Sequence, residues 1–290
     1  MTDQRERGVD AGQWATSGQI ERDLVLTDAD FTRIRELIYQ RAGIVLAEHK
    51  CEMVYSRLAK RLRHHGMTRF TDYLSRLERQ PDAKEWEAFT NALTTNLTAF
   101  FRESHHFPLL AEHIKHKQEP VTIWCSAAST GEEPYSIAMT LLESLGARAS
   151  QAKVIATDID TDALAKARRG IYPQEQVRKL DEARVKRFFQ KGTGNHIGLA
   201  RVRPEVSALV EFMPLNLLAP QWPVKGPFDA IFCRNIMIYF DKDTQAKILK
   251  RFAPLMKPDG LLFAGHSENF SYISDAFKLR GQTVYTLANR

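Results

Sequence analysis

Acidic and amide side chains follow several apolar stretches of the sequence, at positions that could support ligand chemistry. Glu132 and Glu133 come shortly after "VTIWC", Asp158 closes "KVIATD", and the pair Arg234 and Asn235 follows "FDAIFC" directly. Ligands of open parallel sheets bind at the carboxyl ends of the strands. A charge placed directly after a buried strand also needs a partner. The pattern therefore predicts one binding site assembled from these strand ends.

The loop after the first of these stretches does not resemble a phosphate-binding loop. It reads "SAASTGEEPYS", with Gly131 as its single glycine and no lysine, whereas a phosphate cradle needs several glycines and a cation. The carboxylate of Asp158 can accept hydrogen bonds from a ribose diol. Alternatively, Asp158 and the two glutamates could simply cap the helices that follow them. A cationic nucleoside without a phosphate points to S-adenosylmethionine, with S-adenosylhomocysteine as its product.

Alternating strands and helices must position these residues. Strands are expected at 121–127, 153–160, 228–235 and 261–267. Helices are expected between them, at 131–145, 161–170 and 241–256. Such alternation is typical of a parallel sheet with crossover helices. The segment 171–215 breaks it with short helices, a "GTG" turn and the alternating stretches "LARVRP" and "ALVEFMPLN". We therefore expect a Rossmann-like α/β domain at 96–290 with a small antiparallel β insert at 171–215.

Residues 23–95 are interpreted as an all-helical domain, preceded by a flexible tail at 1–22. Thr27 stands three residues before Asp30, which is the spacing of a capping box, and apolar residues then recur at helical intervals. A second helix carries a basic row that comprises Arg57, Lys60, Arg61 and Arg63. Such a row is either a solvated helix face or a docking surface for an acidic partner.

The composition of the 290-residue chain is typical of a cytoplasmic protein with a substantial core. Hydrophobic residues make up 43%, and the net charge is +6 with a pI near 9.2, which favours an acidic partner. The N-terminal residues lack the apolar region of a signal peptide, and no apolar run reaches the ~20 residues of a membrane span. Cys51, Cys125 and Cys233 form no C-x-x-C pair, so neither a zinc site nor a disulfide framework is expected.

The junction between the two expected domains, residues 92–107, has an unusual composition. It reads "ALTTNLTAFFRESHHF" and places threonines and an asparagine beside two phenylalanines. A surface linker would not need the phenylalanines, and a core helix would not need the polar cluster. The junction therefore requires an explanation beyond connecting two domains.

Five segments together resemble a known family. "NALTTNLTAFFRE", "STGEEPYSIA", "ATDID", "FDAIFCRNIMIYFD" and "KPDGLLFAGHSENF" are similar to the chemotaxis receptor methyltransferases, the CheR family, and the likeness extends from about residue 24 over nearly the whole chain. The resemblance implies an S-adenosylmethionine-dependent protein-glutamate O-methyltransferase that uses no metal. Such an enzyme forms methyl esters on glutamates of methyl-accepting chemotaxis receptors and supports chemotactic adaptation.

The resemblance also implies which residues form the site. The positions that match the family's cofactor contacts are Asn96, Thr98, Arg102, Glu133, Asp158, Asn216, Leu217, Arg234 and Asn235. The junction would then form one wall of the cofactor pocket. A glutamate acceptor is already ionised at neutral pH and requires no general base, so catalysis would depend on alignment. Arg102 could orient the incoming carboxylate, and Tyr239 could donate one hydrogen bond to it.

Two further surfaces are expected to meet the receptor. The basic row of the second helix would dock the glutamate-bearing cytoplasmic helices of the receptor. The strand edge of the insert could pair with an extended receptor tail, because the glycine turn at 192–194 resembles the subgroup of the family that binds a C-terminal pentapeptide.

Three other functions fit parts of the sequence. A nucleic-acid methyltransferase would suit the basic charge, but it would need stacking aromatics among the basic residues and a pocket for a flipped base, and the basic helix offers only Tyr55. A cofactor sensor without catalysis is opposed by the presence of Arg102, Asn235 and Tyr239. A nicotinamide dehydrogenase would need the missing glycine fingerprint. We therefore expect no nucleic-acid partner and no insertion into a membrane.

Overall fold

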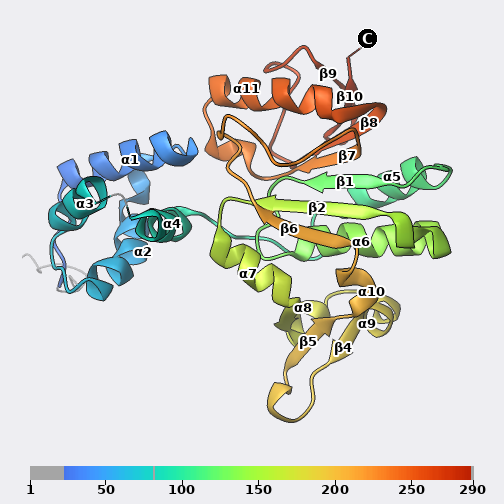
Figure 1. The fold of residues 1–290 in the computed structure, drawn as a ribbon, viewed down its shortest axis with the longest axis horizontal. Helices are drawn as coiled ribbons and strands as arrows, with labels where there is room; N and C mark the ends of the chain where they lie inside the picture. The colour runs from blue at the N-terminus through green and yellow to red at the C-terminus, as the bar shows by residue number, and fades with distance from the viewer. Residues whose placement is uncertain (1–22, 81, 289–290) are drawn as a thin grey trace, which may run out of the picture.

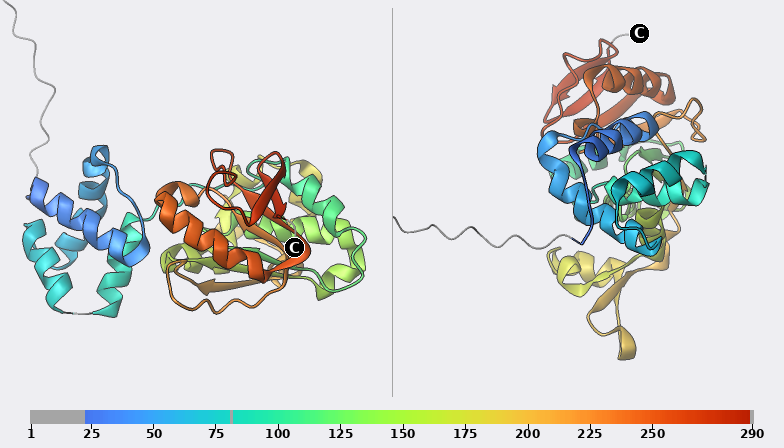
Figure 2. Two further views of the ribbon diagram at one scale, coloured as in Figure 1. Left: turned by 90° about the horizontal axis from the view of Figure 1, so that it is seen from above. Right: turned by 90° about the vertical axis from the view of Figure 1, so that its left-hand side faces the viewer.

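The first of two folded units is all-helical. The computed structural model describes residues 23–80 and 82–288, so the tail predicted at 1–22 lies outside the described residues. The four helices of this unit are α1 (Asp28–Ala42), α2 (Cys51–His64), α3 (Phe70–Arg79) and α4 (Ala83–Leu93). Thr27 and Asp30 form the predicted capping box, and Gly43 ends α1 in the left-handed conformation. Figures 1 and 2 show these helices as a separate group beside the sheet.

A seven-stranded sheet forms the centre of the second unit, in the order β6-β2-β1-β7-β8-β10-β9. Its strands are β1 (Thr122–Cys125), β2 (Lys153–Asp158), β6 (Val210–Pro214), β7 (Phe228–Cys233), β8 (Met256–Ala264), β9 (Phe277–Gly281) and β10 (Val284–Leu287). The strands from β6 to β8 pair in parallel, and the hairpin of β9 and β10 joins in antiparallel. This arrangement confirms the predicted Rossmann-like fold.

Helices cover both faces of this sheet. Successive residues of a strand point to opposite sides, and the strands bury apolar residues on each side. Its longer helices are α5 (His106–Ile114), α6 (Glu132–Leu145), α7 (Thr161–Arg169) and α11 (Lys242–Phe252). Ile123 of β1 belongs to the core that α5, α6 and α7 share. Its neighbour Trp124 faces the other way and packs on Phe252 of α11, with ring centroids 5.1 Å apart. The carboxyl ends of the parallel strands point toward the helical unit (Figure 1).

The insert is a small antiparallel sheet in the order β3-β5-β4. It consists of β3 (Ile171–Pro173), β4 (Phe189–Lys191), β5 (Leu199–Val202), α8 (Gln174–Val177), α9 (Glu182–Phe188) and α10 (Pro204–Ser207). Short 3₁₀ turns of the chain are η1 (Glu48–Lys50), η2 (Gly146–Gln151), η3 (Gly194–His196), η4 (Met237–Tyr239) and η5 (Ala253–Leu255). The insert projects away from the main sheet (Figures 1 and 2).

One part of the predicted insert is wrong. The stretch "ALVEFMPLN" was expected to be an antiparallel strand of the insert, but its strand, β6, pairs in parallel with β2 at the edge of the main sheet. An edge strand is covered less completely than a central one, so it keeps the alternation of apolar and polar residues that is also typical of antiparallel strands. The insert therefore ends before Val210.

Across the residues that the structure describes, no helix is long and apolar enough to cross a membrane.

Candidate active site at the domain junction

A cavity of about 360 Å³ lies between the helical unit and the carboxyl ends of the parallel strands. Residues 44–47 after α1, the junction after α4, and the loops after β1, β2, β6 and β7 all contribute to its wall. The cavity brings together every cofactor and catalytic position expected from the sequence: Asn96, Thr98, Arg102, Glu133, Asp158, Asn216, Leu217, Arg234, Asn235 and Tyr239. Residues more than 140 positions apart in the sequence thus share one wall.

Asp158 ends β2 and presents its carboxylate to the cavity. One carboxylate oxygen accepts a hydrogen bond from the main-chain N–H of Ser129 (2.7 Å), and the other accepts one from Asp160 (2.9 Å). An ionised carboxylate has about four acceptor sites, so capacity remains for a ligand. Burial raises the pKa of Asp158 to about 6. The cap of α7 is Asp160, which accepts from the N–H of Ala163, so the alternative that Asp158 merely caps this helix is wrong.

The polar residues of the junction bind it to the loops of the sheet. The side-chain amide of Asn96 donates to the carboxylate of Asp160 (2.6 Å), and its oxygen accepts from the hydroxyl of Ser129 (2.9 Å). Thr94 also donates to Asp160 (2.6 Å). Asn96 therefore lines the cavity while its amide connects three segments of the wall.

The two phenylalanines anchor the same junction. Phe100 packs edge-on against Tyr172 and Phe189 of the insert. Phe101 packs on Phe107 in the main core and donates its main-chain N–H to Ser136. The junction thus combines polar groups that fix its position along the cavity with aromatic rings that hold it to the domain behind it.

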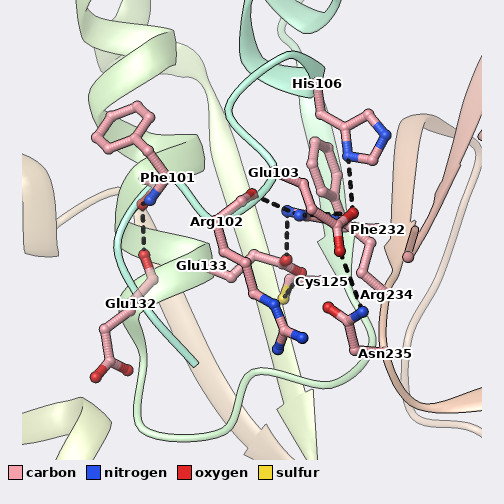
Figure 3. A network of polar contacts seen from close by, with 12 residues as sticks. Phe101, Arg102, Glu103, His106, Cys125, Glu132, Glu133, Phe232, Arg234 and Asn235 are labelled. Carbon is pink, nitrogen blue, oxygen red and sulfur yellow. Dashed lines mark hydrogen bonds and ion pairs between the residues drawn. The ribbon is translucent and has the colours of Figure 1, made fainter. Parts of the chain in front are cut away.

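A buried arginine stands at the centre of a network of polar contacts (Figure 3). The guanidinium of Arg234 is fully buried and pairs with Glu133 (2.8 Å) and Glu103 (3.1 Å). It also donates to the main-chain carbonyl of Arg102 (2.5 Å). Burial raises the pKa of Glu133, while the charge of Arg234 acts in the opposite direction. Because Glu133 also accepts from the thiol of Cys125 (3.3 Å), its carboxylate is held by two partners.

The side chain of Arg102 is held mainly by its own loop. One of its guanidinium nitrogens donates to the carbonyl of Leu97 (2.8 Å). Arginine has five N–H donors, and its planar fork suits a carboxylate. Figure 3 shows this side chain pointing away from the buried guanidinium of Arg234. Arg102 is therefore able to meet an acceptor that enters the cavity.

Two loops of the sheet are tied to the end of α1. Asn216 donates its side-chain amide to the carbonyl of Arg41 (2.8 Å), and the main chain of Val45 donates to the carbonyl of Tyr239 (2.8 Å). Beside the cavity, the hydroxyl of Tyr39 donates to Asp241 (2.8 Å). The helical unit is therefore a structural wall of the site.

The basic row of α2 does not form one continuous surface. Lys60 and Arg63 are exposed, and Arg63 pairs with Asp23 (3.0 Å). Arg57 donates to the carbonyl of Thr94 in the junction. Arg61 pairs with the buried Glu85. It therefore turns inward and does not share the exposed docking face that the sequence predicted for all four cations.

The carboxylate of Glu85 explains why Arg61 is held inside. It also accepts a hydrogen bond from Tyr73 (2.7 Å) and contacts His65 (2.8 Å). Burial acts to raise the pKa of Glu85, but the hydrogen bonds from Arg61, His65 and Tyr73 outweigh it and hold the pKa at about 2. Arg61 is thus part of the internal structure of the helical unit.

Two glutamates near the cavity were missed by the sequence analysis. Glu103 joins Arg234 to the side-chain amide of Asn235 (3.2 Å). Glu268 accepts main-chain hydrogen bonds from the segment that begins at Asn235. The signal for Glu103 was its place directly after Arg102. Glu268 follows the end of β8, so the strand-end rule applied to one more strand would have found it.

In the described part of the chain, no group of His, Cys, Asp and Glu side chains is arranged to hold a metal ion. Cys125 and Cys233 are buried in their strands. Burial raises the pKa of both thiols, and a protonated thiol is a poor nucleophile.

Comparisons with known proteins identify two matching family models and close relatives. Residues 96–286 match "CheR methyltransferase, SAM binding domain", and residues 29–94 match "CheR methyltransferase, all-alpha domain". The chemotaxis protein methyltransferase of Escherichia coli (strain K12) is 60% identical over 277 residues, which cover 96% of this chain and 97% of that protein. The chemotaxis protein methyltransferase 2 of Pseudomonas aeruginosa is 52% identical, with 90% and 94% covered.

Proposed function

This chain belongs to the CheR family of S-adenosylmethionine-dependent methyltransferases, and we propose that it methylates glutamate side chains of methyl-accepting chemotaxis receptors. The product would be a glutamate methyl ester, and the reaction would serve chemotactic adaptation. The observation that carries the proposal is the cavity itself, which places Arg102 and Tyr239 in the same wall as the carboxylate of Asp158. A carboxylate acceptor that met the methyl donor in this cavity would therefore have a cation and a hydroxyl in the same wall.

The donor-binding part of this proposal rests on the residues after β1, β2, β6 and β7. Asp158 would accept hydrogen bonds from the ribose hydroxyls, since its carboxylate still has free acceptor sites. The cavity wall also carries two carboxylates, Glu133 and Asp158, beside the cations Lys50, Arg102 and Arg234, and the sulfonium would be attracted to the carboxylates. Asn216, Leu217 and the junction would enclose the remainder. S-adenosylmethionine supplies an electrophilic methyl group when it is bound there.

The transfer itself requires no proton to move. A glutamate with an ordinary pKa of about 4.3 is already a carboxylate at neutral pH. A carboxylate oxygen forms a bond to the methyl carbon, the carbon–sulfur bond breaks, and its electron pair stays on sulfur to give S-adenosylhomocysteine. Arg102 would orient the acceptor through paired N–H donors, and Tyr239 would donate one hydrogen bond. Alignment and exclusion of water are then the main contributions of the enzyme.

Two surfaces would hold the receptor. Lys60 and Arg63, the exposed cations of α2, would attract its acidic helices. On the insert, a cleft of about 670 Å³ lies beside the edge strand β4 and includes Lys191 and Arg203, which would suit an acidic, extended receptor tail that pairs with the strand. The enzyme would act in the cytoplasm, where the acceptor helices of the receptor lie.

The test is incubation with tritiated S-adenosylmethionine and receptor-containing membranes. Label on the receptor that is released by mild base indicates carboxyl methyl esters. Base-stable label, or label on nucleic acid, would instead support one of the other methyltransferase functions. Arg102→Ala should lose most turnover even at a concentration of S-adenosylmethionine that saturates the variant, a condition that is needed because Arg102 also matches a cofactor contact of the family. The exposed Arg280 of β9 offers a matched control, because Arg280→Ala removes the same group far from the cavity. Unchanged turnover in Arg102→Ala would refute the orienting role.

A further inference from the structure

Glu268 is a buried carboxylate outside the group of residues that line the cavity, and among the described residues its side chain binds main-chain N–H groups only. It lies in the loop after β8 and is 4% exposed. One oxygen accepts the N–H groups of Asn235 (2.9 Å) and Gly265 (2.5 Å). The other accepts those of Ile236 (2.9 Å) and Met237 (2.7 Å). Four donors on one carboxylate form a clasp between two loops of the sheet.

The clasped segment carries much of the cavity wall. Arg234, Asn235, Ile236, Ile238 and Tyr239 all line the cavity within six consecutive positions. This segment leaves β7 without helical or sheet hydrogen bonds of its own until the turn η4 begins at Met237. Its main-chain N–H groups therefore need an external acceptor, and Glu268 supplies it.

The clasp also maintains an unfavourable backbone conformation. Asn235 has a φ of 57°, in the left-handed region that residues other than glycine seldom adopt. Such conformations persist where the surroundings determine them strongly. In this conformation the side chain of Asn235 faces Glu103 and stands beside Arg234 (Figure 3). The backbone position of Asn235 thus decides where its amide lies in the cavity.

The approach of the two loops requires a glycine at position 265. A Cβ atom there would lie 2.7 Å from the main-chain nitrogen of Asn235 and 2.8 Å from a carboxylate oxygen of Glu268. Both distances are shorter than real Cβ contacts, so the loops would have to separate. Gly265 and Glu268 therefore contribute separately to the close approach of the loops after β7 and β8.

We infer that Glu268 is a positioning residue for the methyl-donor pocket: it holds the segment 235–239 in its binding geometry before the ligand arrives. The inference concerns the donor site that the family assigns, and it stands whether or not the acceptor is a receptor glutamate. It also gives the loop after β8, which contributes nothing to the cavity lining, a role in binding.

The experiment compares variants by calorimetric titration with S-adenosylhomocysteine, at a temperature where each is folded. Glu268→Gln keeps the size of the side chain but turns an NH₂ group toward two N–H donors. Loss of these acceptors should weaken affinity on the order of tenfold. Gly265→Ala should weaken it similarly. The matched control is Glu132→Gln, because Glu132 is also a buried glutamate but binds the Thr130 hydroxyl (2.7 Å) and lies outside the cavity wall.

A second measurement separates positioning from general stability. If Glu268→Gln melts earlier but binds the ligand as tightly as the control variant does, the inference is overturned. Hydrogen exchange of the unliganded wild-type protein tests the same point without any substitution. The amides of Asn235, Ile236 and Met237 should already be protected, and rapid exchange there would also overturn the inference, even if a variant failed to fold.

Discussion

At the scale of single residues, the carboxylate of Asp158 links ligand binding to pH. Burial raises its pKa to about 6 in the unliganded protein. In the proposed complex the ribose hydroxyls would donate to the ionised form, so protonation would remove an acceptor. Affinity for S-adenosylhomocysteine should be constant above this pKa and fall roughly tenfold for each pH unit below it. Calorimetric titrations across the pH range would measure the slope. A Kd that does not change through pH 6 would contradict the assignment.

The same residue predicts the opposite effect on stability. A carboxylate whose folded-state pKa is raised contributes stability below its unfolded pKa and loses that contribution as the pH rises through the folded value. At pH 8 the unliganded protein therefore bears the full cost of ionised Asp158. The melting temperature of the unliganded wild type should therefore fall more steeply as the pH rises through about 6 than that of Asp158→Asn, which has no carboxyl group to ionise there and should bind the ligand less tightly. Thermal unfolding with and without ligand would test both signs.

Arg234 should be more important for stability than its single charge suggests. Arg234→Met leaves the carboxylates of Glu133 and Glu103 buried without their cation, which should cost about 3–5 kcal/mol of unfolding free energy. Adding Glu133→Gln removes one of these unpaired charges and should recover part of the loss. Denaturant unfolding of both single variants and the double variant would measure the coupling. Simple addition of the two losses would show that the pair is not coupled.

Most residues of the cavity wall that carry polar groups could be predicted from the sequence. Polar residues directly after apolar stretches predicted the strand-end site, since the fold brings such ends together. Their hydrogen-bond and ion-pair partners were harder to predict. No spacing in the sequence indicates that Asn96 bonds to Asp160 or that Arg61 turns toward Glu85. Both contacts depend on how the helical unit is packed.

At the scale of elements, we expect the exposed cations of α2 to act in docking and its inward-turned cation to act in stability. Lys60→Glu with Arg63→Glu should raise the receptor concentration needed for half-maximal methylation, because both side chains are exposed. The effect should shrink as salt screens the charges. Arg61→Ala should instead lower the melting temperature, since Glu85 loses its ion-pair partner. Rates at low and high salt would distinguish them. Equal docking defects in both variants would contradict this division.

The strand β6 shows where element prediction stops. Its residue pattern located a strand correctly, but pattern alone does not say which strand is its neighbour. The chain leaves the insert after α10 and returns to the main sheet beside β2, and this step depends on long-range packing. The capping box of Thr27 and the glycine stop of α1 were predictable because they are local.

At the scale of the whole molecule, the ligand cavity lies between two units that meet through polar contacts and through Ile159, which packs against the core of the helical unit. Asn91 donates to Thr161 (2.9 Å), and Tyr39 donates to Asp241. A ligand that contacts both units should stabilise both. Saturation to 100 times Kd contributes about 2.7 kcal/mol, and scanning calorimetry should show the unfolding of both units shift upward together. A shift of only one transition would mean that the ligand contacts only that unit.

The proposed reaction joins a methyl group to an ionised glutamate in this cavity. The most direct measurement is peptide mass spectrometry of receptor membranes after incubation with S-adenosylmethionine and the enzyme. We expect methyl groups on glutamate side chains of the receptor, with little modification when Arg102→Ala replaces the wild type. Methyl groups on nitrogen-bearing side chains, or a receptor left unmodified by an enzyme that binds S-adenosylhomocysteine normally, would contradict the proposal.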